Sequence, residues 1–230
     1  MKRKGALIAL PFFAIALAAC GGPSDELPGA EITHKTGQMR VLNLSEGPLE
    51  VKFGSQLNAS PLAVAEGTAT QKVKAGAVKF EAKRDGKVLA SSEVSVEADR
   101  VTTLVLRETA GKLTFDAISQ GKANKPAPGS SSLVVAYAGG EGAPETVSVS
   151  HEGDSSELNK GAVLTIEGLK GEKTEISAST GGAASQKIPC AIEEGGSFTL
   201  FIYYRGSSMK HTLLRTDTKM VPTGESGASN

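Results

Sequence analysis

Hydrophobic and polar residues alternate with a period of two along most of the chain. Val78, Phe80 and Ala82 are separated by charged residues. Such a period places every second side chain on the same face of a β-strand. Short alternating runs bounded by Gly, Pro, Asn or Asp are typical of antiparallel sandwiches. The sequence therefore predicts an all-β protein built from antiparallel, immunoglobulin-like β-sandwiches. Four further runs show the same alternation: 49–53, 113–117, 147–150 and 198–204.

A stretch rich in Pro, Gly and Ser divides this pattern in two. The segment SQGKANKPAPGSS at 119–131 has the composition of a linker. It separates two regions of ordinary domain size, which predicts one sandwich at 36–118 and a second at 132–217. The last residues, 218–230, have the composition of a disordered tail.

The two predicted domains resemble each other in sequence. TLVLRETAGKLTF at 103–115 aligns without a gap with TLFIYYRGSSMKH at 199–211. VKFEAK at 78–83 aligns with TEISAS at 174–179 at the same offset. A constant offset across the segment predicts that the second domain repeats the first.

This repeat predicts the role of Cys190, for which a nucleophile, a metal ligand and half of a disulfide are the alternatives. At the common offset Cys190 corresponds to Val94, and Ile192 corresponds to Val96. We therefore expect Cys190 to lie in the second core. A thiol in apolar surroundings has a raised pKa and is unreactive.

The N-terminus has the features of a bacterial lipoprotein signal. A basic start precedes the apolar run 6–19, which is too short to span a membrane as a helix. The run ends in LAACGG at 17–22, small residues around a cysteine, as in a lipobox. We expect a signal peptide at 1–19, lipidation of Cys20, and a tether at 20–35. An ordinary signal peptide that happens to contain a cysteine is the alternative.

Lipidation of Cys20 would determine where the protein is located and whether Cys190 has a disulfide partner. More than one acyl chain anchors a protein stably to a membrane. Gly21 rather than Asp follows the lipidated residue, which favours the periplasmic face of the outer membrane. Because Cys20 would carry lipid, Cys190 would have no disulfide partner within the chain.

Charge and composition exclude some functions. The full chain has 25 basic and 25 acidic residues, and removal of the basic signal leaves it mildly acidic. It therefore has no basic field for nucleic acid. There is no Trp, and Tyr and Phe are few, which weighs against carbohydrate binding by aromatic stacking.

Candidate catalytic and metal-binding residues are scattered. The histidines are His34, His151 and His211, and none belongs to a recognisable catalytic motif. His151, Asp154 and Glu157 offer ligands to a cation, although an acidic hairpin loop accounts for them equally well. We predict no catalytic, cofactor-binding or metal-binding residues, and no enzyme activity.

Several segments resemble a known group of secreted β-domains. The strand MRVLNLSEGPLEVKFGSQ at 39–56 contains Arg40 and Asn43 in a V-R-[VI]-x-N-like pattern. VSVEADRVTTLVL at 94–106 and IEEGGSFTLFIYYRGSSMKHTLLR at 192–215 resemble later hairpins of the same group. These segments are similar to AlgF-like proteins, accessory proteins of alginate O-acetylation, and to the domain of unknown function DUF4397. The second start, SLVVAYAGG at 132–140, and the lipid anchor depart from the pattern.

The resemblance implies two tandem β-domains and a non-catalytic adaptor role in the O-acetylation of a secreted, alginate-like polysaccharide. It implies as partners a membrane O-acyltransferase and an SGNH-type acetyltransferase protein. The alternative is a general envelope lipoprotein that binds other proteins without a link to acetylation.

One strand suggests a surface for such a partner. In 198–204, alternation turns Phe198, Leu200 and Ile202 inward and turns Phe201 and Tyr203 to the opposite face. Exposed aromatic residues can mark an interface. We therefore name Phe201 and Tyr203 as a possible partner surface, the alternative being that the tail, a loop or the first domain covers them.

Overall fold

The computed structural model describes residues 35–54, 56–57, 61–121, 126–170, 173–181 and 184–216. These residues belong to one compact unit. The predicted signal peptide, Cys20, His34 and the tail at 218–230 lie outside them. Over the described ranges, no helix is long and apolar enough to cross a membrane.

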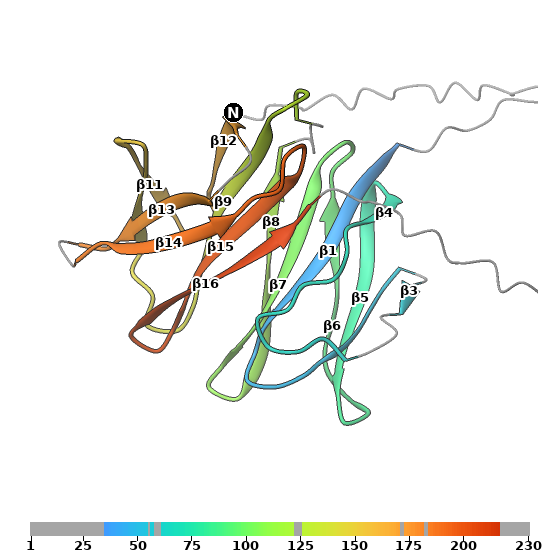
Figure 1. Cartoon of the computed structure of the whole chain (residues 1–230). Coiled ribbons are helices and arrows are strands. Elements are labelled where there is room, and N and C mark those ends of the chain that lie inside the picture. The colour runs from blue at the N-terminus through green and yellow to red at the C-terminus, as the bar shows by residue number, and fades with distance from the viewer. Residues whose placement is uncertain are drawn as a thin grey trace, which may run out of the picture. The chain divides into compact units, whose positions relative to one another are not determined.

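The first half of the chain forms a sandwich of two four-stranded sheets (Figure 1). One sheet has the order β4-β1-β7-β8 and the other β3-β2-β5-β6. We call these eight strands the first sandwich. They are β1 (Thr36–Leu44), β2 (Glu50–Phe53), β3 (Gln56–Leu57), β4 (Gln71–Lys74), β5 (Gly76–Arg84), β6 (Lys87–Val96), β7 (Val101–Thr109) and β8 (Lys112–Gln120).

The second half forms a sandwich of the same topology, which we call the second sandwich. Its sheets have the orders β12-β9-β15-β16 and β11-β10-β13-β14. Each strand thus has a counterpart in the first sandwich with the same neighbours, and the repeat predicted from the sequence is confirmed. The strands are β9 (Ser131–Gly139), β10 (Thr146–His151), β11 (Asp154–Asn159), β12 (Val163–Leu169), β13 (Lys173–Ser179), β14 (Gln186–Ala191), β15 (Ser197–Arg205) and β16 (Ser208–Arg215).

The all-β prediction is confirmed, with one correction to strand direction. In each sandwich one pair of neighbours is parallel, β1 with β7 and β9 with β15, and the other pairs are antiparallel. Alternation of side chains reveals that a segment is a strand, but it is the same for both directions of the neighbouring strand. The parallel pairs were therefore not predicted.

The segment between the sandwiches is shorter than the composition suggested. β8 extends through Ser119 and Gln120, and β9 begins at Ser131. These three residues were assigned to the linker, but they make ladder pairs, for example Gln120 with Val101. These polar residues belong to strands because the last residues of β8 pair with β7 and the first residue of β9 pairs with Leu169.

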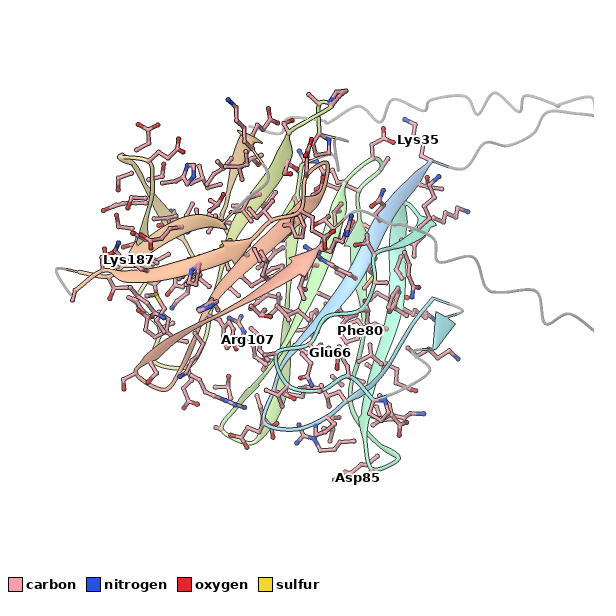
Figure 2. The ribbon with its side chains drawn as sticks, in the orientation of Figure 1. Lys35, Glu66, Phe80, Asp85, Arg107 and Lys187 are labelled. Atoms are coloured by element: carbon pink, nitrogen blue, oxygen red, sulfur yellow. The ribbon has the colours of Figure 1, made fainter. Side chains whose placement is uncertain are left out.

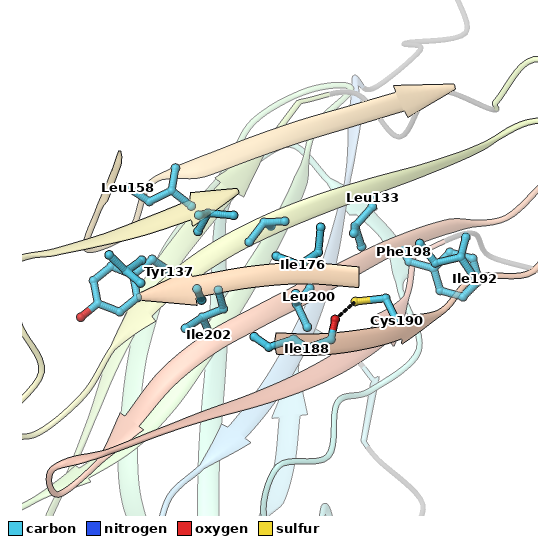
Figure 3. Close-up of a cluster of buried hydrophobic side chains, with 14 of the residues drawn as sticks. Leu133, Tyr137, Leu158, Ile176, Ile188, Cys190, Ile192, Phe198, Leu200 and Ile202 are labelled. Carbon is cyan, nitrogen blue, oxygen red and sulfur yellow. Dashed lines mark hydrogen bonds between the residues drawn. The ribbon is translucent and has the colours of Figure 1, made fainter. Parts of the chain in front are cut away.

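Each sandwich encloses its own hydrophobic core. In the second core, side chains from both sheets meet around Ile176 and Leu200 (Figure 3). The alternating positions of the sequence supply most of these side chains, as the period of two requires. The first core contains Met39, Val41, Leu49, Val51, Phe53, Leu62, Val78, Phe80, Ala82, Val94, Val96, Leu104, Leu106 and Leu113.

A third hydrophobic cluster joins the two sandwiches. It takes side chains from β1, β7 and β8 of the first sandwich and from β9 and β15 of the second. We call β4-β1-β7-β8 and β12-β9-β15-β16 the inner sheets, and the other two the outer sheets. Because the inner sheets are covered on both faces, the first six residues of β7 and the first seven of β15 are all buried.

Candidate functional site

Cys190 is a core residue, as the repeat predicted. Its side chain is 1% exposed and packs among aliphatic residues of the second core. The thiol donates a long hydrogen bond of 3.7 Å to the carbonyl oxygen of Ile188 (Figure 3). Burial raises the pKa of the Cys190 thiol to about 11. A thiol with so high a pKa has almost no thiolate at neutral pH, so Cys190 is not a nucleophile.

The acidic hairpin at 151–157 does not bring its three candidate ligands together. His151 and Asp154 are paired at the tip of the β10–β11 hairpin, and Glu157 lies opposite Ser148, further along the ladder. Within the described ranges no three His, Cys, Asp or Glu side chains lie close enough to hold a metal ion.

The contact between the inner sheets corrects the expectation for Phe201 and Tyr203. Phe201 is fully buried and Tyr203 is 9% exposed. Both belong to the cluster that joins the sandwiches, where they meet Leu42 and Val105 of the first sandwich. They are therefore not available as an exposed docking surface. Their outward direction in the strand was correctly inferred, but the first sandwich covers the face to which they point.

Polar contacts lie along the same interface. Arg107 on β7 donates to the carbonyl oxygen of Ala138 on β9 and forms an ion pair with Asp116. Figure 2 shows Arg107 between the strands of the two sandwiches. Further along, Arg205 donates to the carbonyl oxygen of Ser45 over 3.0 Å. The bonds from Arg107 to Ala138 and from Arg205 to Ser45 connect one sandwich to the other.

Arg40 is the most unusual residue of the interface. It is among the largest fully buried side chains of the described residues. Its Nε donates to Thr103 Oγ1 over 2.9 Å, and its Nη1 donates to Thr216 Oγ1 over 3.3 Å. The guanidinium lies over the ring of Phe201, with 5.4 Å between Cζ and the ring centroid. Arg40 therefore connects strands of both sandwiches.

The charge of Arg40 lacks a carboxylate partner among the described residues. Burial lowers the pKa of Arg40 to about 9, and no acidic group offsets this shift. The side chain remains protonated at neutral pH, so a positive charge is enclosed between the sheets. A buried ion without a counter-ion costs several kcal/mol. Its Nη2 has no hydrogen-bond partner among these residues either, and an unpaired buried donor costs about 1–3 kcal/mol or more.

The motif residue Asn43 has a different, structural role. Its Nδ2 donates to the carbonyl oxygens of Gly47 and Leu62, at 3.0 and 2.9 Å. The counterpart of Asn43 in the second sandwich is Tyr137, whose hydroxyl donates to the carbonyl oxygen of Pro144 over 2.6 Å. Each side chain stabilises the turn that follows the first strand of its own sandwich. This explains how the second start departs from the Asn-containing pattern and keeps the same fold.

A crevice opens between the inner sheets at one end of the interface. Its volume is about 190 Å³. Gln120, from the first sandwich, and Thr216, from the second, belong to its wall and are connected through Thr199. Since Thr216 also accepts from Arg40, the crevice and the buried charge share one hydrogen-bond network. The lining includes Val101, Gln120, Val134, Thr165, Phe198 and Thr216.

These observations define a class of protein, a duplicated β-sandwich whose two inner sheets are joined by a buried interface. Comparison with known proteins adds to this only at the level of fold. No known protein family and no curated protein matches the chain.

Solved structures give weak likenesses. The C-terminal domain of AlgF from P. aeruginosa is 18% identical, with a TM-score of 0.31, over 37% of this chain and 99% of that one. The N-terminal domain of AlgF is 22% identical, with a TM-score of 0.27, over 36% and 93%. A family CBM26 module from Eubacterium rectale Amy13K, solved with maltoheptaose, is 12% identical, with a TM-score of 0.29, over 79% and 98%. All are β-domains, and at these values the likeness assigns no function.

Sequence reasoning missed the two residues that distinguish the interface. Arg40 was noticed only as part of a strand motif, and Gln120 was placed in the linker. Arg40 is a charged residue in a run of apolar ones, MRVLNL at 39–44, and that contrast was the available signal. No signal marks Gln120, because its burial depends on the second sandwich.

Proposed function

We propose that the protein is a lipid-anchored, extracytoplasmic adaptor, without catalytic activity, in the O-acetylation of a secreted, alginate-like polysaccharide. Its partners are a membrane O-acyltransferase and an SGNH-type acetyltransferase protein. The sequence resemblance to AlgF-like proteins motivates this role. The structural observation that supports it is the pair of sandwiches, in tandem and joined by a continuous buried interface. Such a body holds two outer surfaces at a fixed spacing, which is what an adaptor requires.

Both outer faces carry ion pairs, but among the described residues only the second face has a group of hydroxyl side chains at its centre. On the first sandwich the face opposite the core carries charges of both signs, with ion pairs such as Lys83–Glu81 at 2.9 Å and Lys79–Glu93 at 3.8 Å. On the second sandwich the corresponding face has an ion pair, Lys187–Glu175 at 2.8 Å, and Glu157 opposite Ser148, but its centre carries hydroxyl groups. These are Thr146, Ser148, Ser150, Ser155, Ser177 and Ser179, which pair across β10, β11 and β13.

The hydroxyl face is the better candidate for a protein partner. Serine hydroxyls carry no charge and have short side chains, so little desolvation energy and little side-chain entropy oppose binding. The charged groups on the face of the first sandwich cost more free energy to remove from water. We therefore assign the SGNH-type protein to the outer face of the second sandwich.

Deletion of the gene tests the role. We expect the secreted polysaccharide to lose most of its O-acetyl groups while its amount is unchanged, measured by NMR of the purified polymer. The intact gene should restore acetylation. Unchanged acetylation in the deletion strain would contradict the proposal and favour a general envelope protein.

Substitutions on the two outer faces test the assignment of the partner. We expect Ser150→Arg with Ser177→Arg to abolish co-purification of the SGNH-type protein without changing the melting temperature, because both side chains point away from the core. The matched control is Lys52→Ser with Glu81→Ser, a pair that is adjacent on the first outer face. Loss of capture in the control alone would place the partner on the first sandwich instead.

A further inference from the structure

The outer sheet of the first sandwich ends in a long strand with a free edge. β6 is the last strand in the order β3-β2-β5-β6, and with ten residues it is the longest strand that the structure describes. It pairs regularly with β5 from Ala90 to Val96, and the register shifts at Leu89. A strand at the edge of a sheet presents backbone groups to which another strand can bind.

The hydrogen bonds of the neighbouring strands show which backbone groups of β6 point outward. The carbonyl oxygen of Lys79 on β5 accepts a hydrogen bond over 2.9 Å from Gly54, which follows β2, so the backbone of Lys79 is directed toward β2. Glu93 lies opposite Lys79. Because bonded and non-bonded pairs alternate along an antiparallel ladder, Glu93 directs its N–H and C=O away from β5. The same holds for Ser91 and Ser95, two residues to either side, and all three residues are exposed.

The equivalent edge of the second sandwich differs at the central position. β14 has six residues. At the common offset of the repeat, Pro189 corresponds to Glu93, and their partners on the neighbouring strands correspond as well. Proline has no N–H, and on an edge strand it hinders the addition of a further strand. The repeat therefore has a closed edge on β14 and an open edge on β6.

Apolar side chains beside the open edge are incompletely covered. Val88 on β6 is 45% exposed. Leu89 on β6 and Phe115 on β8 pack against the first core but are only half-buried. A groove of about 650 Å³ lies between the first residues of β6 and those of β8, where Val88, Leu89 and Leu113 form its apolar part and most other lining residues are charged, with both signs present. Pockets of this volume hold ligands of drug size, so an apolar side chain of an added strand fits.

The charge at the centre of the open edge distinguishes between two occupants. A second copy of the chain would pair through the same edge in both copies. The register that uses all the outward groups would then place Ser91 opposite Ser95 and Glu93 opposite Glu93, and like charges directly opposite are destabilising. The ion pair of Glu93 with Lys79 is long, at 3.8 Å, and both side chains are exposed, so Glu93 can accept from a further base. A strand with Lys or Arg at this position is therefore a better occupant than a second copy.

We propose that the open edge of β6 binds an extended segment of a partner protein as an added β-strand. The segment has a basic residue opposite Glu93 and an apolar side chain that enters the groove. Its backbone bonds to the outward groups of Ser91, Glu93 and Ser95, as in other cases of strand addition. The inference rests on β6 itself and does not depend on the role in O-acetylation. For an adaptor, this site is separate from the hydroxyl face of the second sandwich.

Hydrogen exchange in the full-length protein tests whether the edge is open. We expect the amide protons of Ser91, Glu93 and Ser95 to exchange at least about tenfold faster than those of Ser92 and Val94, whose N–H groups point to β5. Equal protection of all five amides would show that the edge is already covered, and the proposal would be wrong.

A peptide of alternating residues tests the binding. The probe is acetyl-VTVKVTV-amide with a fluorescent label, titrated with the full-length protein. We expect saturable binding with a Kd of about 1 mM or tighter, and the three outward amides should gain protection. Replacing the lysine of the probe with glutamate should weaken binding at least about fivefold, because a like-charge pair replaces an opposite-charge pair. The absence of saturable binding, or equal affinity for both peptides, would overturn the proposal.

Variants at position 93 connect the binding to the edge. Glu93→Pro copies the second sandwich and removes an outward N–H, so it should fold as the wild type does and bind the probe at least about fivefold more weakly. If Glu93→Pro does not fold, Glu93→Lys provides the test, since it should reverse the preference and bind the glutamate peptide better than the lysine peptide. Glu157→Lys is the matched control, because Glu157 is an exposed glutamate on β11 of the second sandwich, and it should leave both affinities unchanged. An unreversed preference in Glu93→Lys, or a reversed preference in Glu157→Lys, would place the peptide elsewhere and contradict the proposal.

Discussion

At the scale of single residues, burial determines the chemistry of this protein more than residue type does. Cys190 is a thiol that its surroundings make unreactive, and Arg40 is a cation that its surroundings make costly. Both have pKa values displaced by desolvation, in the directions that favour the neutral form. The neutral thiol is the protonated form, whereas the neutral guanidine is the deprotonated form. Rising pH therefore destabilises the fold through Cys190 and stabilises it through Arg40.

Cys190→Val tests the first of these effects. Valine matches the counterpart residue Val94, so the variant should be as stable as the wild type at neutral pH, within about 1 kcal/mol. Because folding raises the thiol pKa from 9.0 to about 11, the unfolded thiol loses its proton first. The wild type should therefore lose stability relative to the variant as pH rises from 9 to 11, by roughly 2 kcal/mol. Chemical denaturation at several pH values measures this difference.

Two controls accompany the Cys190 experiment. Cys190→Asp places an unpaired charge in the second core and should unfold that sandwich. The native wild type should react with a thiol reagent only at the rate of unfolding. Rapid labelling of the native protein, or a flat difference between pH 9 and 11, would be incompatible with a buried thiol.

Arg40→Met tests the second effect. Replacing the unpaired buried cation with an apolar side chain of similar length should raise the free energy of unfolding at pH 7 by about 1–3 kcal/mol. Folding lowers the pKa of Arg40 from 12.5 to about 9, so above pH 9 the unfolded state binds more protons. The wild type should then gain stability relative to the variant as pH rises. Parallel denaturation of both proteins from pH 7 to about 10.5 measures the difference, and a difference that widens would contradict the assignment. Arg40→Ala, which leaves a cavity, should destabilise.

At the scale of elements, the sequence predicts the strands well and their surroundings less well. The run at 78–82 was predicted to alternate, and Val78, Phe80 and Ala82 are all buried on one face. The constant offset between the halves predicted that β7 and β8 recur as β15 and β16. These signals are local, since they depend only on which side chains share a face of one strand.

What the sequence did not predict depends on contacts between distant elements. The run 113–117 implied that Ala117 faces the core with Leu113, but Ala117 is exposed, and Ile118 is buried on the opposite face. The second sandwich covers that face of β8, and a period of two cannot show a second buried face. The interface residues were missed for the same reason. Gln120 and Arg40 acquire their roles only when the inner sheets meet.

At the scale of the whole molecule, the sandwiches form one body and the N-terminal segment is expected to attach it to a membrane. We expect Cys20→Ser to abolish incorporation of labelled palmitate and to leave the protein unprocessed or in the soluble fraction. Cys190→Ser is the control and should incorporate palmitate at the wild-type level, since Cys190 is buried. Equal labelling of Cys20→Ser and the wild type would exclude lipidation at Cys20.

The buried arginine has a consequence for how this chain arose. Equivalent faces of the two sandwiches meet at the interface, as the counterparts Val105 and Phe201 show. A dimer of identical single sandwiches that met through this face would be symmetric, so every interfacial residue would occur twice. An arginine at position 40 would then enclose two like charges. When both sandwiches belong to one chain, their sequences can differ. The first sandwich has Arg40, and the equivalent position of the second sandwich has Val134. Gene fusion thus permits a solitary charge that symmetry would forbid.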